Sequence, residues 1–370
     1  MMSVDNTANV SYVGAASHYL SPNRRDPVKR LWEEPFSRSV LVRAVESLQL
    51  EPEAPIRVVD IGAGIGDGLD LLESALESAN NRSDLRKRPV TYVGIDIDGE
   101  MITTAREVHG HRPDAQFIQA DVREFVPGSS ADLYISAGVP YSHFTEDELT
   151  DVLSNIFAVV RKTSSRATVV VDVLGRYSRE WEPCWDQSRW EYNMSFFQDT
   201  DDVITTPMTF HSRSSLATSI TTGAERGGVR IRGIEYFDRS VAVGRHTATG
   251  AFNPQLPPYR TLVNSLFQRD TKIDINNLMM EPPAQHAPEE VESFFAHFIG
   301  AWNTRITEAA HQEDKLGVAP WERWNLARDL CQLEQSSQRG LGVGHSLIAV
   351  VMVEGSAEVE NLPSDEHDST

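Results

Sequence analysis

The stretch VVDIGAGIGDG, residues 58–68, decides the fold of this 370-residue chain. Its first residues continue an apolar run that begins at Ile56, and glycines follow at positions 62, 64 and 66. Because glycine lacks a Cβ atom, the backbone can turn sharply there and a ligand can lie against it. A helix-like segment, 68–79, comes next. We therefore expect a buried strand, a glycine-rich turn that binds a ligand, and a helix.

Strand-like and helix-like segments alternate after this stretch. The predicted strands are 56–61, 91–96, 115–121, 131–137 and 167–174. The predicted helices between them are 68–79, 99–108 and 145–160. This alternation is typical of a parallel sheet with right-handed helical crossovers. The Val-rich run 167–174 is almost continuously apolar, as expected of a strand that is covered on both faces.

The flanking segments suggest how the chain is divided. We expect an N-terminal helical segment, a ligand-binding core, a helical elaboration that makes substrate or dimer contacts, a final strand that joins the core, and a disordered acidic tail. Their ranges are 1–50, 51–246, 247–340, 341–354 and 355–370. Within them, helices are predicted at 28–49, 212–225, 289–312 and 320–338, and strand-like runs at 229–237, 240–246 and 345–353. The Pro-rich part, 247–288, is predicted to be irregular.

Composition excludes several classes of function. The chain has 34 basic and 54 acidic residues, a net charge of −20, which argues against nucleic acid and anionic membranes as partners. Two cysteines, Cys184 and Cys331, make neither a disulfide framework nor a cysteine-based zinc site, and the histidines lack metal-ligand spacing. The start MMSVDNTANV has no apolar signal core, and no run approaches 18 apolar residues. We expect a cytoplasmic globular protein without a metal.

The spacing Asp60-x-Gly62-x-Gly64-x-Gly66 resembles the S-adenosylmethionine (SAM) loop of class I methyltransferases. A dinucleotide-binding turn would place its third glycine at position 67, where this chain has Asp67. An acid before the first glycine would repel a pyrophosphate and would suit a ligand with an ammonium group. GIDID and QADV, at the ends of the second and third strands, match later landmarks of the family in order.

The resemblance implies a seven-stranded, mostly parallel, doubly wound α/β sheet with SAM across the carboxyl ends of its strands and S-adenosylhomocysteine (SAH) as product. It implies that Asp96 hydrogen-bonds the ribose hydroxyls, that Asp121 accepts from the adenine amino group, and that Val122 lies against the ring. Taken singly, either acid could instead cap a helix or turn. The expected cofactor-binding residues are Asp60, Gly62, Ala63, Gly64, Gly66, Asp96, Ile97, Asp121, Val122 and Ser136.

The segment SAGVPYSHF, residues 136–144, lies where this family usually places catalytic groups. His143 could act as a general base, because an ordinary histidine pKa suits proton removal near neutral pH, although a histidine here is often structural. Tyr141 could contact the substrate or assist catalysis. Val-Pro-Tyr faintly resembles the motif of enzymes that methylate base amino groups. Gly138, however, lacks the side-chain carbonyl that would hold the amine, which argues against a nucleic-acid base as acceptor.

Seven aromatic residues crowd into residues 177–197, after the fifth strand: Tyr177, Trp181, Trp185, Trp190, Tyr192, Phe196 and Phe197. We expect Trp181, Trp185 and Trp190, with Tyr141, to form the wall of a substrate pocket. Ordinary packing of a lid onto the sheet is the alternative. Asp172, inside the apolar fifth strand, could be a buried acid near the pocket or could point to a helix terminus.

The resemblance therefore predicts a SAM-dependent methyltransferase that acts on a small, aromatic or apolar acceptor by in-line SN2 displacement. The acceptor atom, whether O, N or C, is left open. One alternative is another enzyme on the same fold, such as an aminopropyl transferase or a decarboxylase-like enzyme. A second alternative is a non-catalytic binding module. A homodimer contact would come from the helical elaboration.

Overall fold

The computed structural model describes residues 15–21, 25–51, 53–79, 85–86, 88–128, 131–163, 166–194, 205–243, 252–268, 271, 273–316 and 320–355. Its centre is one mixed sheet in the order β3-β2-β1-β4-β5, after which β9 and β8 continue on one path and β7 and β6 on another. The strands are β1 (Ile56–Ile61), β2 (Val90–Asp96), β3 (Ala115–Gln119), β4 (Leu133–Ile135), β5 (Arg166–Gly175), β6 (Arg189–Asn193), β7 (Thr205–His211), β8 (Val229–Arg239) and β9 (Ser346–Gly355).

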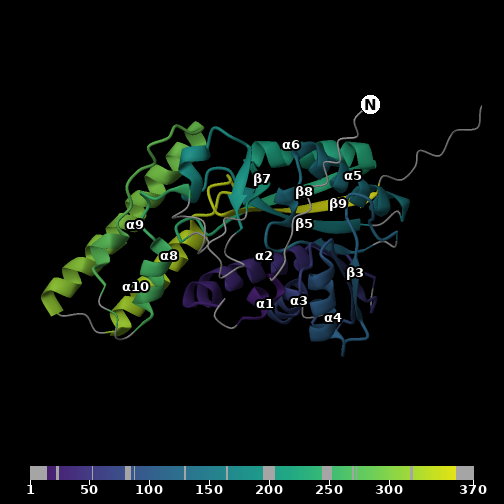
Figure 1. The fold of residues 1–370 in the computed structure, drawn as a ribbon, viewed down its shortest axis with the longest axis horizontal. Coiled ribbons are helices and arrows are strands. Elements are labelled where there is room, and N and C mark those ends of the chain that lie inside the picture. Colours follow the sequence, from purple (N-terminus) through teal and green to yellow (C-terminus); the bar gives the residue numbers. More distant parts are fainter. Residues whose placement is uncertain are drawn as a thin grey trace, which may run out of the picture.

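Helices cover both faces of this sheet (Figure 1). The α-helices are α1 (Ala15–Leu20), α2 (Glu34–Glu46), α3 (Asp67–Ser78), α4 (Gly99–His109), α5 (Glu146–Lys162), α6 (Arg213–Gly227), α8 (Tyr259–Leu266), α9 (Glu289–Leu316) and α10 (Pro320–Ser336). Shorter helical turns are η2 (Lys29–Glu33), η4 (Pro140–His143), η5 (Arg179–Cys184) and η7 (Ile275–Leu278). One hydrophobic core joins α5 and α6 to one face, and another joins α2, α3 and α4 to the opposite face.

The strand pairings confirm the expected fold class. β1 pairs in parallel with β2 and β4, β2 with β3, and β4 with β5. β9 lies antiparallel between β5 and β8. The path β3-β2-β1-β4-β5-β9-β8 is therefore the predicted seven-stranded, mostly parallel sheet. Because its parallel strands end at the same edge, the loops after β1, β2, β3 and β4 meet there.

An additional hairpin extends the sheet beyond the predicted seven strands. β6 pairs antiparallel with β7, and β7 runs parallel to the carboxyl end of β5 through Leu174 and Phe210. The prediction of a strand at 240–246 is wrong for its described part, because residues 240–243 form no strand. Helix α8 lies in the part that was expected to be irregular. The predicted acidic tail, 355–370, lies outside the described residues from residue 356 on, and Gly355 is the last residue of β9.

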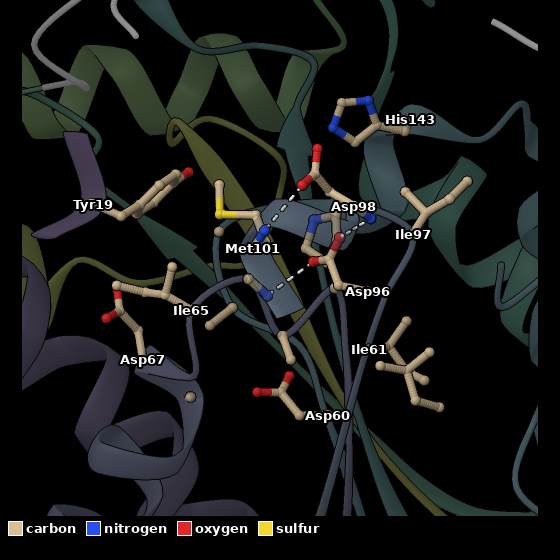
Figure 2. Close-up of a pocket in the computed structure, with 18 of the residues that line it drawn as sticks. Tyr19, Asp60, Ile61, Ile65, Asp67, Asp96, Ile97, Asp98, Met101 and His143 are labelled. Carbon is tan, nitrogen blue, oxygen red and sulfur yellow. Dashed lines mark hydrogen bonds between the residues drawn. The ribbon is translucent and has the colours of Figure 1, made fainter. Parts of the chain in front are cut away.

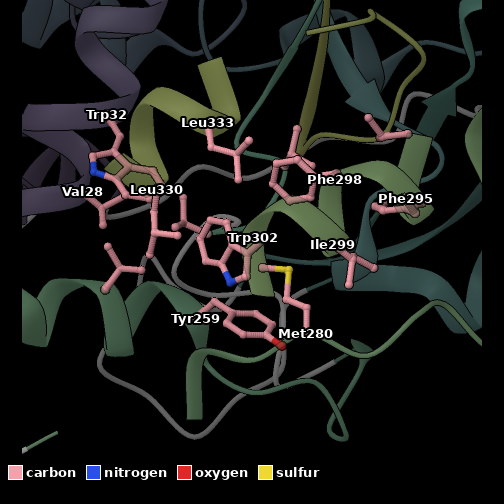
Figure 3. Close-up of a cluster of buried hydrophobic side chains, with 14 of the residues drawn as sticks. Val28, Trp32, Tyr259, Met280, Phe295, Phe298, Ile299, Trp302, Leu330 and Leu333 are labelled. Atoms are coloured by element: carbon pink, nitrogen blue, oxygen red, sulfur yellow. The ribbon is translucent and has the colours of Figure 1, made fainter. Parts of the chain in front are cut away.

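The carboxyl-terminal helices share a core of their own with the extra hairpin and the N-terminal segment (Figure 3). Trp302 on α9 is completely buried, and its indole N–H donates to the carbonyl oxygen of Leu278 at 2.8 Å. Trp32 and Val28, which precede α2, are buried in the same cluster. This core therefore fixes the N-terminal segment against α9 and α10, next to the edge of the sheet where the loops meet.

Candidate functional site

A cavity of about 1160 Å³ opens at the carboxyl ends of β1, β2 and β3. Loops after these strands line it together with residues of α1, α2, β6 and β7. Asp96, Asp98 and Met101 lie centrally in this wall in Figure 2, with Asp60 on one side and His143 on the other. A site for a single ligand usually occupies about 300–1,000 Å³. This cavity has room for a cofactor and a second molecule.

The glycine turn wraps around the end of β2. The backbone N–H groups of Gly62 and Ala63 both donate to the carbonyl oxygen of Ile95, at 2.8 and 3.0 Å. Gly62, Gly64 and Gly66 have φ values of +69°, +54° and +97°, a region that side chains strongly disfavour. Gly62, Ala63 and Gly64 line the cavity.

Gly66 allows α4 to pack closely against the glycine turn. A Cβ atom at this position would lie 2.6 Å from the ring of His109, so the glycine lets α4 approach the turn. Gly66 is not among the cavity-lining residues.

Asp96 lies at the cavity wall and holds the turn in place. Its Oδ2 accepts from the N–H of Gly64 at 2.8 Å, and its Oδ1 accepts from the N–H of Asp98 at 2.9 Å. Burial raises the pKa of Asp96 above its ordinary value, although these N–H groups act in the opposite direction. The carboxylate therefore links the cavity wall to the glycine turn.

Asp60 is a buried acid that lines the same cavity. Tyr92 donates its hydroxyl to Oδ2 at 2.5 Å, whereas Oδ1 has no hydrogen-bond partner within the described part of the chain. Burial, with the nearby charges of Asp96 and Asp67, raises the pKa of Asp60 to about 7. A positive charge on a bound ligand would stabilise the ionised form of Asp60.

These observations fit SAM. The turn offers an open backbone at Gly64, where a Cβ atom would meet no atom within 4 Å. Asp96 presents its carboxylate at the wall. Asp60 is a buried acid with an unpartnered oxygen, which favours a cationic ligand nearby.

The other expected cofactor residues are not all equally exposed to the cavity. Asp121, Val122 and Ile97 line it, and Ile97 is 51% exposed. The carboxylate of Asp121 accepts from the Arg123 guanidinium, with a closest distance of 2.6 Å. Burial alone would raise the pKa of Asp121, but the hydrogen bonds from Arg123 lower it.

Ser136 lies behind the cavity wall. Its Oγ donates to the carbonyl oxygen of Val170 at 3.1 Å and accepts from the N–H of Asp172 at 3.0 Å. The neighbouring Ala137 lines the cavity in its place.

Asp172, the acid inside β5, is buried and holds the loop after β4. Its Oδ2 accepts from the N–H of Gly138 at 3.1 Å and from Arg239 at 3.1 Å. Gly138 and Val139 then adopt left-handed conformations, with φ values of +86° and +63°. This bend directs η4, and with it His143, toward the cavity.

His143 lines the cavity, whereas Tyr141 does not. Burial lowers the pKa of His143 to about 4, and the positive charge of Arg189 adds to this effect. Tyr141 is completely buried and packs against Phe144, with ring centroids 6.2 Å apart. Burial raises the pKa of Tyr141 far above its ordinary value, so its hydroxyl stays protonated. Tyr141 is thus placed to support the loop rather than to exchange protons.

The tryptophans of the aromatic run pack away from the cavity. Trp181 and Trp185 are buried and Trp190 is partly buried in the core that they share with the carboxyl-terminal helices, and none of the three lines the cavity. Trp190 stacks on Phe210 of β7 at 4.2 Å, and Trp185 stacks on Phe295 of α9 at 5.8 Å. The structure therefore favours packing, the alternative interpretation, over a substrate wall. Phe196 and Phe197 lie outside the described residues.

Residues that the sequence did not suggest also line the cavity. Tyr19 of α1 does so near the glycine turn, where Ala16 packs against Ile65 and Met101. Others are basic: Arg38 on α2, Arg189 on β6 and Arg239 at the end of β8. Because these arginines are far apart in the sequence, no motif or spacing could have identified them.

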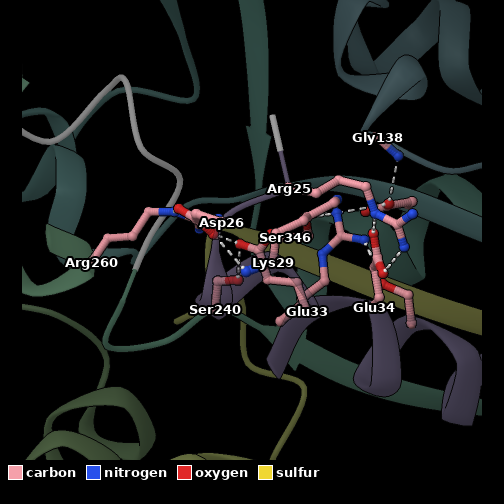
Figure 4. A network of polar contacts seen from close by, with 12 residues as sticks. Arg25, Asp26, Lys29, Glu33, Glu34, Gly138, Ser240, Arg260 and Ser346 are labelled. Atoms are coloured by element: carbon pink, nitrogen blue, oxygen red, sulfur yellow. Dashed lines mark hydrogen bonds and ion pairs between the residues drawn. The ribbon is translucent and has the colours of Figure 1, made fainter. Parts of the chain in front are cut away.

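A polar network anchors the N-terminal segment beside this cavity (Figure 4). Arg260 of α8 donates to Asp26 at 2.8 and 2.9 Å and to Glu33 at 2.8 Å. Ser240, after β8, donates to the same oxygen of Glu33 at 3.0 Å. These bonds tie α2, and therefore Arg38, to α8 and to the end of β8.

Two absences hold for the described residues. No group of three or more His, Cys, Asp or Glu side chains there is arranged to hold a metal ion. No helix in that part of the chain combines the length and apolarity needed to cross a membrane.

Known proteins resemble this chain in sequence or in fold. The model of a family described as a methyltransferase domain matches residues 58–163. Among solved structures, the chain is similar to the complex between the Haloferax volcanii Trm112 methyltransferase activator and the putative methyltransferase, at 11% identity over 94% of this chain and 96% of that chain, with a TM-score of 0.41. No curated protein matches the sequence.

Two more solved structures are similar to this chain. One is an S-adenosylmethionine-dependent methyltransferase from Clostridium acetobutylicum, at 10% identity over 62% of this chain and 91% of that chain, with a TM-score of 0.40. The other is magnesium protoporphyrin IX methyltransferase from Synechocystis with bound SAH, at 13% identity over 55% and 75% of the two chains, with a TM-score of 0.35.

Proposed function

We propose that the chain is a class I SAM-dependent methyltransferase and that it transfers the methyl group to a small-molecule acceptor bound in the same cavity as SAM. The observation that carries this proposal is one shared cavity of about 1160 Å³, lined both by the glycine turn and by His143. A site of this size fits a cofactor and a small acceptor side by side. The expected dimer contact through 247–340 stays a prediction.

The residues on the cavity wall have distinct proposed roles. Gly62, Ala63 and Gly64 would bind SAM along their backbone, and Asp96 would accept hydrogen bonds from its ribose. When bound, SAM supplies a methyl group on a sulfonium sulfur, and in-line attack by the acceptor releases the neutral thioether SAH. Asp60 would stabilise the positive charge of the donor before transfer. The protein's contribution is therefore chiefly to orient the two reactants.

Asp96→Ala should weaken SAH binding by about 1.5–3 kcal/mol, because hydrogen bonds to a charged acceptor are lost. Isothermal calorimetry on the purified variant measures this loss. Part of this loss of affinity would be indirect, because Asp96 also holds the glycine turn in place by accepting from the N–H of Gly64. Asp274→Ala is a suitable control, because it removes the cap of η7 at a position that does not line the cavity. Unchanged SAH affinity in Asp96→Ala would exclude the proposed ribose contact.

His143→Ala should lower kcat by less than about tenfold, the effect of one lost hydrogen bond to the acceptor. A pKa of about 4 makes this imidazole a weak proton acceptor near neutral pH, so we assign it a positioning role. It follows that the wild-type rate should not fall as the pH is lowered from 8 to 5.5 on account of His143, which stays neutral in this range. A rate loss above 100-fold, with a wild-type pH profile that falls near 6.5, would instead identify a general base.

Product analysis with methyl-labelled SAM tests the proposed function itself. Label in a small-molecule product, with one SAH formed for each methyl transferred, is the expected result. Transfer of the aminopropyl group or loss of carbon dioxide would indicate one of the other reactions found on this fold. SAH binding without turnover in extracts that contain small molecules would favour the non-catalytic alternative.

A further inference from the structure

The charged residues of the cavity come from two different parts of the chain. Six aspartates line it from the carboxyl ends of β1 and β2, from the loops after β2 and β3, and from the first turn of α3: Asp60, Asp67, Asp70, Asp96, Asp98 and Asp121. Four arginines and Lys29 line it from outside the matched segment 58–163. Arg25 pairs with Glu34, and we call the other three arginines, Arg38, Arg189 and Arg239, the arginine side. The acids suit a cationic methyl donor, so the arginine side is left for the acceptor.

Arg189 contacts the loop that carries His143, and Arg239 is linked to this loop through Asp172. Arg189 donates to the carbonyl oxygen of Phe144, the residue after His143, at 3.4 Å, and its charge lowers the pKa of His143. Arg239 bonds to Asp172, which in turn accepts from the N–H of Gly138 in the same loop. The hydroxyl of Ser37, next to Arg38, accepts from Arg239 at 3.0 Å.

Two of these three arginines have no carboxylate partner within the described part of the chain. Arg239 pairs with Asp172 at 3.1 Å and is 10% exposed. Within the described ranges, Arg189 donates to neutral oxygens, those of Phe144 and of the Thr209 hydroxyl. Arg38 has a buried Nε with no hydrogen-bond partner there. A buried donor that is left unpaired is destabilising, so such groups call for an explanation.

The absence of carboxylate partners for Arg38 and Arg189 among the described residues contrasts with the other cations of the cavity wall. The chain has 54 acidic residues against 34 basic ones, so carboxylates are plentiful. Other cations on the cavity wall have them: Arg25 pairs with Glu34, Lys29 with Glu33, and Arg123 with Asp121 and Glu148. An anionic group on a bound molecule would supply the charge that Arg38 and Arg189 lack.

We propose that the methyl acceptor is a small organic acid whose carboxylate binds to Arg38 and Arg189; this rests on the proposed function. A guanidinium is a planar fork of N–H donors that matches the two oxygens of a carboxylate. A phosphate is less suited, because the arginine side has no glycine-rich turn and no free helix N-terminus among the described residues. The acid would also be attracted to the cationic donor bound opposite.

The test uses the whole protein saturated with SAH and matched pairs of probes. Benzoate and hexanoate are titrated against benzamide and hexanamide, with phenyl phosphate as a further arm, and affinity is measured by calorimetry. We expect each acid to bind at least tenfold more tightly than its amide. Arg38→Met and Arg189→Met should each remove at least tenfold of the acid's affinity and leave SAH binding unchanged. Arg43→Met is the matched control on α2, where Arg43 pairs with Glu235 at the surface.

Each outcome bears on one proposal. Equal binding of acid and amide, no binding of any probe, or acid binding that survives both arginine variants would overturn the carboxylate assignment. Tighter binding of phenyl phosphate than of benzoate would replace the carboxylate with a phosphate and also overturn it. Failure of SAH to bind the wild-type protein, in contrast, would count against the proposed function and not against the arginine side alone.

Discussion

Replacing Gly62 with alanine should lower the free energy of unfolding by about 2–5 kcal/mol, whereas Gly64→Ala should lower it by only about 1–2 kcal/mol. Both residues lie in the glycine turn with positive φ, at +69° and +54°. A side chain in this conformation costs about 1–2 kcal/mol at either position. The two substitutions differ in what the new methyl group would meet.

At Gly62, a Cβ atom would lie 2.4 Å from the Cβ of Pro140. Real Cβ atoms do not approach other atoms this closely, so the turn or η4 must move, and overpacking of this kind costs about 1–3 kcal/mol more. Because Pro140 begins the short helix that ends at His143, the movement would also disturb the acceptor loop.

At Gly64, a Cβ atom would meet nothing within 4 Å. Since Gly64 lines the cavity, the added methyl group would occupy space needed by the ligand, and SAH affinity should fall by more than stability does. Urea unfolding and SAH calorimetry on both variants separate the two effects. Equal losses of stability would show that Pro140 does not restrain the turn.

The order of the core elements could be predicted because each carries a local signal. The apolar strand before Gly62, the glycine spacing and the acid at Asp96 follow one another within 40 residues, and the structure brings them to one wall of the cavity. Such features depend on neighbours in the sequence, and the alternation of strand and helix then dictates on which edge of the sheet they meet.

The extra hairpin could not be predicted in the same way. β7 contains Pro207 within a run of threonines, and proline ordinarily argues against a strand. Trp190 and Phe210 stack across this hairpin, so the aromatic run is used for packing between layers that are distant in sequence. A count of aromatic residues cannot distinguish a substrate wall from such a core. The sequence does not reveal the arginine side for the same reason, because only folding brings its three arginines to one cavity.

Arg260→Met should lower the free energy of unfolding by about 3–5 kcal/mol, because it removes the guanidinium that pairs with two carboxylates in a buried site. Arg260 is 6% exposed and binds both Asp26 and Glu33. Burial alone would raise the pKa of Asp26, but the hydrogen bond and charge of Arg260 lower it. In the wild type, this interaction contributes stability above the ordinary aspartate pKa and is lost as the pH falls through the lowered one. In Arg260→Met, burial raises the pKa of Asp26 without the opposing effect of the guanidinium, so ionisation of Asp26 destabilises the folded protein. The difference in the free energy of unfolding between wild type and variant should therefore grow as the pH rises from 4 to 7.

The triple variant Asp26→Asn, Glu33→Gln, Arg260→Met distinguishes two causes of instability. One is the loss of the favourable ion pairs, and the other is the cost of leaving buried carboxylates without the guanidinium, which we call stranded charge. Breaking a buried ion network is costly mainly because it leaves unpaired charges, whereas replacing every charged member can be nearly neutral. The triple variant should therefore recover most of the stability that Arg260→Met loses, as measured by urea unfolding at pH 7. Arg43→Met, at an exposed ion pair, should cost less than about 1 kcal/mol. If the triple variant is as unstable as Arg260→Met, stranded charge is not the cause, and the network's hydrogen bonds to Ser240 and Asn264 must hold the N-terminal segment in place.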